Sequence, residues 1–406
     1  MKLLFLSDNF VPESNAPATR TYEHCREWVK QGVEVTVITG APNFPYGKTY
    51  DGYKNKLYQT EMIDGIKVIR VWTYMTENKG LVKRIIDYFS FAVGAFLAGL
   101  FVKTDLIVAT SPQLFTALGG CALAKVRRKP WIFELRDLWP EGIKDAGAIK
   151  KKRILDFLVS MELCLYRQAT YVITVTKGLK KNLISRGIEE SKIDTVTNGA
   201  NLVMFKARDK NQDIIKSLGL QDKFIFGYIG THGMAQGLEF IVDSIKEVDD
   251  ENIHFLFIGT GAKKEPTVTL AKKLNLKNVT FLDPVDKSEV AEYISIIDVA
   301  LIPLTKTDIH ASLIPSKIFE SASMKKPILL GVEGEAREIV ETHNAGVAFE
   351  SENKKEFLEG VIKLSSDKIL YNKCIDGCTK LADAFERKRL AAKMLTMLKK
   401  VKEENE

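Results

Sequence analysis

The residues best suited to chemistry lie in one short segment, Pro315-Ser-Lys-Ile-Phe-Glu320. Pro315 and Ser316 are typical of the start of a helix, and Lys317 would fall in its first turn. A helix N-terminus offers free N–H groups and the positive end of a dipole, which together favour a phosphate. Glu320 would lie on the same helical face as Lys317, so that this face offers a cation for a diphosphate and a carboxylate for ribose hydroxyls. The alternative is that Glu320 only caps the helix.

A second group of polar residues accompanies an apolar run that predicts a buried strand, Trp131–Leu135. Glu134 lies near the end of this run, and Arg136 and Asp137 follow it directly. Ligands of parallel sheets bind beyond the carboxyl ends of the strands, which makes these residues candidates for a site. The structural alternative is an Arg136–Asp137 pair that braces Trp139.

Other nucleotide and metal chemistries lack their motifs. Gly259-Thr-Gly261 follows a predicted strand, but Lys264 stands where a dinucleotide-binding loop has its third glycine. No Walker loop ending in Gly-Lys-Ser or Gly-Lys-Thr occurs. The five cysteines have no histidine at ligand spacing, so neither a zinc site nor a disulfide is expected. We expect no metal and no cofactor.

Short apolar runs alternate with helical stretches, and this pattern occurs twice along the 406 residues. The first series predicts strands over Lys2–Ser7, Val33–Thr39, Ile66–Trp72, Asp105–Ala109, Trp131–Leu135 and Tyr171–Val175. The second predicts strands over Phe224–Ile229, Ile253–Gly259, Val279–Leu282, Val299–Ile302, Ile328–Gly331 and Gly346–Phe349. Two series of βαβ units predict an α/β protein with two doubly wound parallel sheets. We expect domains over 1–203 and 204–382, with a last helix over about 383–406 that crosses back to the first domain.

Several short motifs follow one another over nearly the whole chain, and their order is as informative as their residues. They are Phe10-Val-Pro-Glu-Ser14 through Arg20, Gly32-Val-Glu-Val-Thr-Val37, Arg136-Asp-Leu-Trp-Pro-Glu141, Thr174-Val-Thr-Lys-Gly-Leu179, Val196-Thr-Asn-Gly-Ala200, Tyr228-Ile-Gly-Thr-His-Gly233, Gln236-Gly-Leu-Glu239 and Pro315-Ser-Lys-Ile-Phe-Glu320. Together they resemble retaining family 4 glycosyltransferases of the GT-B fold, in which two Rossmann-like domains face each other across a cleft. The resemblance is greatest to bacterial enzymes of the N-acetyl-L-fucosamine transferase type in O-antigen or capsule assembly.

The resemblance implies a set of site residues. Those with catalytic roles are Asp137, Arg136, Lys317 and Glu320. Those that bind the donor are Asn15, Arg20, Gly230, His232, Gly233, Gln236, Gly259, Ser312, Pro315, Ser316 and Glu335, and those that bind the acceptor are Glu134 and Trp139. Asp137 would orient an acceptor or sugar hydroxyl, and Arg136 would reach an acceptor phosphate. His232 is equally well interpreted as a turn residue between glycines.

The chain also departs from the family pattern. Ser312 stands where many members have the first Glu of an E-x7-E motif. Thr231, His232 and Gln236 occupy the loop in which members usually have two basic residues, and Asn15-Ala16 replaces a common glycine pair. The diphosphate would then depend on backbone N–H groups and on Lys317, with Arg20 closing over it.

The implied reaction is the metal-independent transfer of a UDP-activated amino sugar, with retention, to a glycan linked to polyprenyl diphosphate. Stabilising the negative charge that develops on the leaving UDP is the main demand on such a site. The first alternative is an isomerase of the same fold, similar to UDP-N-acetylglucosamine 2-epimerase. The second is a non-catalytic protein that binds nucleotide sugars.

One apolar run, Tyr88–Val102, is too short to span a bilayer and has basic residues on both sides. It predicts either a core helix or a helix in the membrane interface, which would give peripheral contact with anionic lipid through about 79–103. The N-terminal residues do not form a signal peptide, so we expect a cytoplasmic protein at the inner face of the membrane. The net charge of +7 is a modest excess, and we expect no nucleic-acid partner.

Overall fold

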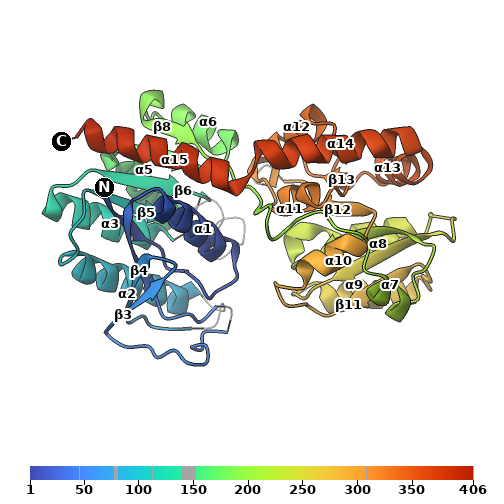
Figure 1. The fold of residues 1–406 in the computed structure, drawn as a ribbon, viewed down its shortest axis with the longest axis horizontal. Helices are drawn as coiled ribbons and strands as arrows, with labels where there is room; N and C mark the ends of the chain where they lie inside the picture. Colours follow the sequence, from blue (N-terminus) through green and yellow to red (C-terminus); the bar gives the residue numbers. More distant parts are fainter. Residues whose placement is uncertain (45, 77–80, 112, 139–151, 308–309, 406) are drawn as a thin grey trace. The chain divides into compact units, whose positions relative to one another are not determined.

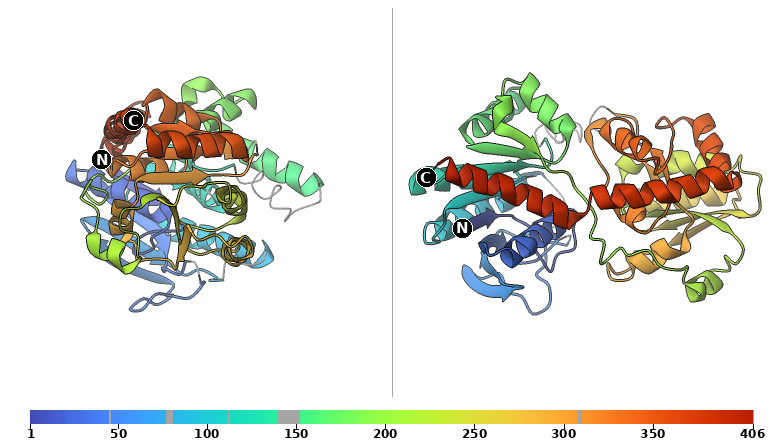
Figure 2. Two further views of the ribbon diagram at one scale, coloured as in Figure 1. Left: turned by 90° about the vertical axis from the view of Figure 1, so that its right-hand side faces the viewer. Right: turned by 45° about the horizontal axis from the view of Figure 1, so that its top comes forward.

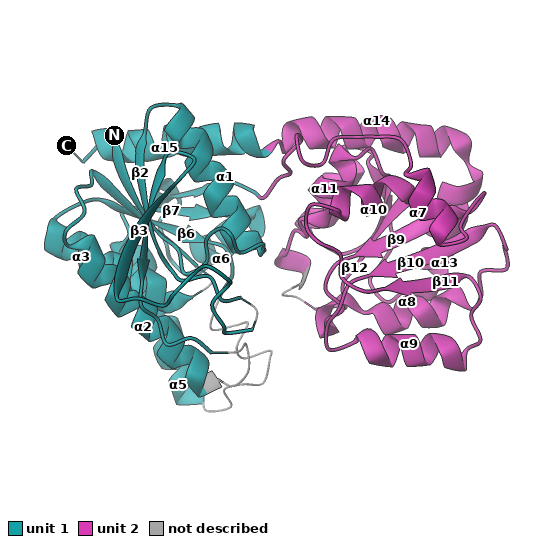
Figure 3. Cartoon of the chain, turned by 60° about the horizontal axis from the view of Figure 1, so that its bottom comes forward, with its two compact units in different colours: residues 1–197, 387–406 teal, residues 198–386 magenta. Residues whose placement is uncertain are grey.

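The computed structural model describes residues 1–406 except 45, 77–80, 112, 139–151, 308–309 and 406. The described chain forms two compact units, shown in two colours in Figure 3. Unit 1 comprises Met1–Thr197 and Arg387–Glu406, and unit 2 comprises Asn198–Glu386. The sequence predicted the first boundary after residue 203 and the second near 383, whereas the units divide after Thr197 and after Glu386.

Unit 1 contains an eight-stranded sheet in the order β3-β4-β2-β1-β5-β6-β7-β8. The strands are β1 (Lys2–Leu6), β2 (Glu34–Gly40), β3 (Tyr58–Ile63), β4 (Ile66–Val71), β5 (Leu106–Thr110), β6 (Trp131–Leu135), β7 (Tyr171–Thr174) and β8 (Ile193–Thr195). The predicted parallel sheet is confirmed, with two strands added at its edges. β3 is antiparallel to β4, and its residues alternate between exposed and half-buried, so it lacks the apolar run of a central strand. β8 has only three residues.

The helices of unit 1 cover both faces of this sheet (Figures 1 and 2). They are α1 (Ala16–Lys30), α2 (Leu81–Gly99), α3 (Leu114–Arg127), α5 (Lys152–Gln168), α6 (Lys177–Ser185), the short 3-10 helix η1 (Glu190–Lys192) and α15 (Arg387–Glu403). α15 returns from the end of the chain to pack beside α1, where Trp28 Nε1 donates a 2.8 Å hydrogen bond to the Ala391 carbonyl. Its buried residues, Leu390, Met394 and Leu398 among them, belong to the same core as β1 and β2.

Unit 2 contains a six-stranded parallel sheet in the order β11-β10-β9-β12-β13-β14. The strands are β9 (Phe224–Ile229), β10 (Ile253–Ile258), β11 (Val279–Leu282), β12 (Val299–Pro303), β13 (Ile328–Gly331) and β14 (Gly346–Ala348). The helices are α7 (Gln212–Ser217), η2 (Met234–Gln236), α8 (Leu238–Ile245), α9 (Lys264–Lys273), α10 (Val290–Ile296), η3 (His310–Ser312), α11 (Lys317–Ser323), α12 (Glu335–Thr342), α13 (Lys354–Ser366) and α14 (Lys368–Ala384). All six strands were predicted from the sequence.

The apolar run Tyr88–Val102 lies in α2 and just after it, and both interpretations of the run have support. Phe91 is fully buried in the core of unit 1, whereas Phe101 is 89% exposed. Val82, Ile86, Phe89, Val93 and Leu97 are also exposed and recur every three or four residues, which places them on one helical face. No helix in the described chain is long and apolar enough to cross a membrane.

Candidate functional site

The predicted site of unit 2 lies where its strand order reverses. β9 pairs with β10 on one side and with β12 on the other, so the connections diverge between β9 and β12. Such a switch point leaves a crevice beyond the carboxyl ends of the strands. Gly230–Gly233 follows β9, Gly259–Gly261 follows β10, and the segment through η3 into α11 follows β12. The fold therefore brings the predicted donor residues of unit 2 to one edge of the sheet.

Lys317 and Glu320 lie together at this edge. Both line one small cavity of about 20 Å³ beside Ile229 at the end of β9. Lys317 Nζ is 5.2 Å from the centroid of the Tyr228 ring, a cation–π distance. Burial lowers the pKa of Lys317, and the nearby Glu320 carboxylate partly offsets this effect. The two residues thus lie together, as their spacing in the sequence predicted, and their roles toward a diphosphate and a ribose stay predictions.

Glycine is required at Gly230, beside this lysine, and at Gly259, beside Gly230. Gly230 has a φ of +146°, and a Cβ atom there would lie 2.5 Å from Lys317 Nζ. Gly259 has a φ of +143°, and a Cβ atom there would lie 1.9 Å from the Gly230 carbonyl oxygen. The loops after β9 and β10 are thus in close contact. This contact alone explains why residue 259 is a glycine, whether or not the loop binds a ligand.

His232 is fully buried in the loop after β9. Its ring meets the edge of Tyr228 at a centroid distance of 5.6 Å. Burial lowers the pKa of His232 to about 4, and the positive charges of Lys264 and Lys317 act in the same direction. Both ring nitrogens are buried, and neither forms a hydrogen bond within the part of the chain that the structure describes. The side chain is therefore a neutral imidazole with hydrogen-bonding capacity left over.

The remaining predicted residues of unit 2 lie in a loop or at the ends of helices. Gln236 Oε1 accepts a 2.9 Å hydrogen bond from the Gly233 N–H and so holds the loop. Ser316 precedes α11 but forms no capping hydrogen bond through its side chain, and Pro315 lies just before it. Ser312 ends η3, and Glu335 is the first residue of α12, the helix predicted to begin there.

Unit 1 has its own switch point, between β1 and β5. A polar cavity of about 230 Å³ lies there, lined by Asp8, Asn9, Asn15, Pro17, Asn43, Phe44, Thr76, Arg84, Asp87, Tyr88 and Gln113. Asn15, predicted to bind the donor, lines this cavity and also caps α1 by accepting a 2.9 Å hydrogen bond from Ala18 N. Gln113 donates a 3.0 Å hydrogen bond to Asp8.

Two carboxylates of this cavity were missed in the sequence. Burial raises the pKa of Asp8 well above its usual range, and the Asp87 and Glu13 carboxylates raise it further. Burial also raises the pKa of Asp87 to about 7. Perturbed carboxyl groups in a crevice are candidates for function. The available signals were the position of Asp8 directly after the first predicted strand and the position of Asp87 directly before the apolar run Tyr88–Val102.

Arg20 and Glu134 form a buried ion pair. Arg20 Nε lies 3.0 Å from Glu134 Oε1, and both side chains are almost fully buried. The other donors of Arg20 bind the Val196 and Thr197 carbonyls within unit 1. Contact of Arg20 with the donor, or of Glu134 with the acceptor, stays a prediction that would require these bonds to rearrange.

Arg136 and Asp137 follow β6 as predicted but do not pair by a hydrogen bond. The Arg136 N–H donates a 2.8 Å hydrogen bond to Ser111 Oγ, which fixes the start of the loop. The Arg136 guanidinium is buried, and its NH1 group lacks a partner in the described chain. Burial lowers the pKa of Arg136 to about 10. Asp137 is exposed, and Trp139 lies outside the described residues.

Two family models match the chain, one on each side of the boundary between the units. The glycosyl transferase 4-like domain matches residues 15–199, and the model described as glycosyl transferases group 1 matches residues 210–380. The chain is a group 1 glycosyltransferase. These matches do not favour the epimerase interpretation.

Curated relatives agree with this assignment, and solved structures share the fold. The glycosyltransferase is 27% identical over 291 residues to the putative colanic acid biosynthesis glycosyl transferase WcaI of Escherichia coli, covering 69% of this chain and 71% of that one. It is 25% identical to the putative teichuronic acid biosynthesis glycosyltransferase TuaH of Bacillus subtilis, covering 49% of each chain. Among solved structures it resembles sucrose-phosphate synthase from Thermosynechococcus elongatus (TM-score 0.77, 14% identity, 98% of each chain). It also resembles Anabaena HepE in complex with UDP and glucose (TM-score 0.72, 15% identity, 98% of this chain and 99% of that one). These likenesses show the GT-B fold.

Proposed function

We propose that the glycosyltransferase moves an amino sugar from a UDP-sugar to a glycan carried on polyprenyl diphosphate, in the assembly of a bacterial surface polysaccharide. Within the sequence resemblance, N-acetyl-L-fucosamine is the first donor sugar to test. Retention of the anomeric configuration rests on the same resemblance.

The observation that carries the proposal is the placement of Lys317 and Glu320 at the switch point of unit 2. A nucleoside diphosphate needs a cation where charge develops on the leaving oxygen, and Lys317 provides one in a buried setting where its charge is weakly screened. Glu320 is the carboxylate available for ribose hydroxyls. HepE, which has the same fold, was solved with UDP and glucose, and this supports a UDP-sugar as the donor.

The names of the relatives support the proposed product. WcaI is described as acting in colanic acid biosynthesis and TuaH in teichuronic acid biosynthesis. A lipid-linked acceptor remains in the membrane, so the enzyme must reach the lipid surface. The exposed apolar face of α2 suits peripheral contact, and the basic residues Lys83 and Lys103 near its ends suit anionic lipid. We place the enzyme at the cytoplasmic side of the membrane.

Calorimetry of UDP binding tests the donor site directly. We expect wild-type protein to bind UDP and Glu320→Gln to bind it at least tenfold more weakly, since the lost carboxylate accepts hydrogen bonds from the ribose. Glu338→Gln is the control, because Glu338 is exposed in α12 of the same unit. Wild-type affinity for UDP in the Glu320 variant would contradict the assignment of Glu320 to the ribose. Absence of UDP binding by wild-type protein would contradict a UDP-sugar as the donor.

A further inference from the structure

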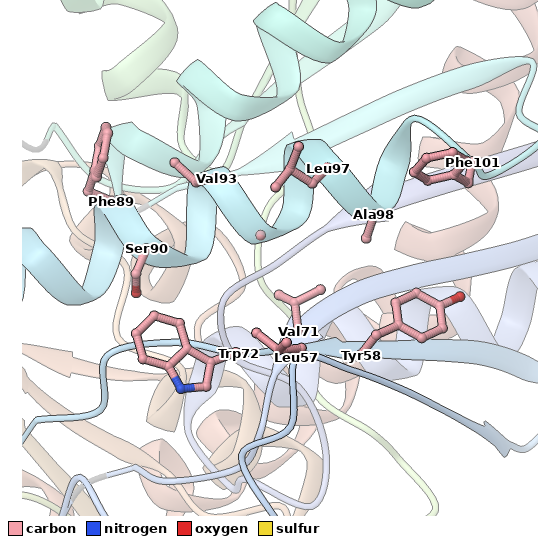
Figure 4. A pocket seen from close by; sticks show the side chains of 11 residues that line it. Leu57, Tyr58, Val71, Trp72, Phe89, Ser90, Val93, Leu97, Ala98 and Phe101 are labelled. Carbon is pink, nitrogen blue, oxygen red and sulfur yellow. The ribbon is translucent and has the colours of Figure 1, made fainter.

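An apolar groove lies along the C-terminal half of α2 (Figure 4). Its volume is about 550 Å³, and its lining comes from α2 on one side and from β3 and β4 on the other. Phe89, Val93 and Leu97 lie on α2 and Phe101 just after it, and Leu57 and Trp72 lie on the strand side. All six side chains are at least 43% exposed, so the groove is open among the residues of unit 1 that the structure describes.

The groove and the polar cavity of unit 1 share no lining residue, but neighbouring residues of the same two segments line them. α2 lines the polar cavity with Arg84, Asp87 and Tyr88, and from Phe89 onward the same helix lines the groove. The segment after β4 also lines both cavities: Trp72 lines the groove, and Thr76, further along the chain, lines the polar cavity.

Two further observations join these walls. Ser90 Oγ accepts a 2.8 Å hydrogen bond from Tyr74 N, which ties the segment after β4 to α2 where one cavity gives way to the other. Asp87, Ser90, Gly94 and Ala98 follow one another at intervals of three or four residues, so that they form one line on the helix. This line begins at a carboxylate in the polar cavity and ends among the apolar residues of the groove.

We propose that the two cavities together hold one amphipathic acceptor molecule, with its saccharide in the polar cavity and a single hydrocarbon chain in the groove. This inference rests on the proposed function, because it assigns the acceptor lipid of that reaction to particular residues. Carboxylates and amides of the polar cavity suit sugar hydroxyls, and Arg84 is its cation for a phosphate. A groove lined by aliphatic and aromatic side chains suits a chain without polar groups.

The binding test uses farnesyl phosphate, a single-chain phosphate, below the concentration at which it forms micelles. We expect calorimetry to show binding to the wild-type protein and none of inorganic phosphate at the same concentration. Val93→Trp and Leu97→Trp fill the groove from exposed positions and should weaken binding at least tenfold, because the chain then loses buried area. Val126→Trp is the control, because Val126 is exposed on α3 of the same unit and outside the groove.

Flotation with anionic vesicles and transfer to acceptors of two chain lengths separate the possible outcomes. The proposal is supported if Val93→Trp and Leu97→Trp no longer bind farnesyl phosphate and no longer prefer the long-chain acceptor, yet still glycosylate the short-chain acceptor. It is overturned if they keep farnesyl phosphate binding and lose only vesicle binding, because the groove then contributes to membrane contact but does not hold the hydrocarbon chain. Equal use of both chain lengths by wild-type protein also overturns it. If wild-type protein binds farnesyl phosphate but not UDP, the proposed function is contradicted, whereas the groove remains a binding site for the hydrocarbon chain.

Discussion

Arg20 donates a 3.0 Å hydrogen bond from Nε to Glu134 Oε1, and the two residues lie 114 positions apart in the chain. The pair joins α1 to β6, and two further donors of Arg20 bind the Val196 and Thr197 carbonyls, where the first part of unit 1 ends. The Arg20 charge lowers the pKa of Glu134 against the opposing effect of burial, so the carboxylate stays ionised.

Removing one partner of this pair should destabilise unit 1. We expect Glu134→Ala to reduce the free energy of unfolding by about 3–5 kcal/mol, because it leaves the Arg20 charge buried without its partner. Urea denaturation measures the change. Glu359→Ala removes one member of an exposed pair with Lys363 and should cost less than about 1 kcal/mol. Similar losses in both variants would show that Arg20 does not depend on Glu134.

Lys317 should act in the chemical step. We expect Lys317→Ala to lower kcat on the order of a hundredfold, since one contact that stabilises the developing charge is lost. Steady-state kinetics with the functional UDP-sugar measures this, and Lys325→Ala, an exposed lysine just beyond α11, is the control. An unchanged kcat with a raised KM would mean that Lys317 contributes only to binding.

We predict that transfer needs no divalent metal, because we expect Lys317 and backbone N–H groups to stabilise the charge of the diphosphate. Activity should survive an excess of EDTA. Complete loss of activity that magnesium or manganese restores would contradict this prediction.

Asp87 should make stability depend on pH. Burial raises the pKa of Asp87 to about 7, above the value of about 3.9 for an Asp in an unfolded chain. Between these values the folded chain binds the proton more tightly, so the free energy of unfolding should fall as the pH rises from about 4 to 7. Denaturation of Asp87→Asn across this range should show a smaller fall. An equal slope in both proteins would assign the dependence to other groups such as Asp8.

The phenylalanines of the apolar run should differ in their effect on membrane binding. We expect Phe101→Ser to weaken flotation with anionic liposomes at low salt, because this side chain is 89% exposed. Phe91→Ser should instead destabilise the fold, since Phe91 is buried, and half-buried Phe96 should fall between them. Wild-type binding should weaken at high salt. Failure of wild-type protein to float with anionic liposomes at low salt would contradict the predicted membrane contact.

The sequence predicted the fold well because buried parallel strands are continuous apolar runs, as in Val299–Ile302. It missed β3 because an exposed edge strand such as Tyr58–Ile63 mixes polar and apolar residues. Lys317 and Glu320 were predictable because they share one helix. The Arg20–Glu134 pair and the approach of Asp8 to Asp87 depend on contacts between distant elements, which spacing along the chain does not encode.

The return of α15 has a consequence for the order of assembly on the ribosome. Trp28 and its neighbours on α1 are buried against a helix whose first residue, Arg387, is synthesised after all of unit 2. The first unit to be translated is therefore the last to be completed, and its apolar surface around Trp28 stays uncovered during synthesis of the second. A nascent chain halted near residue 386 would present that surface to chaperones although nearly all of its sheet residues had already emerged.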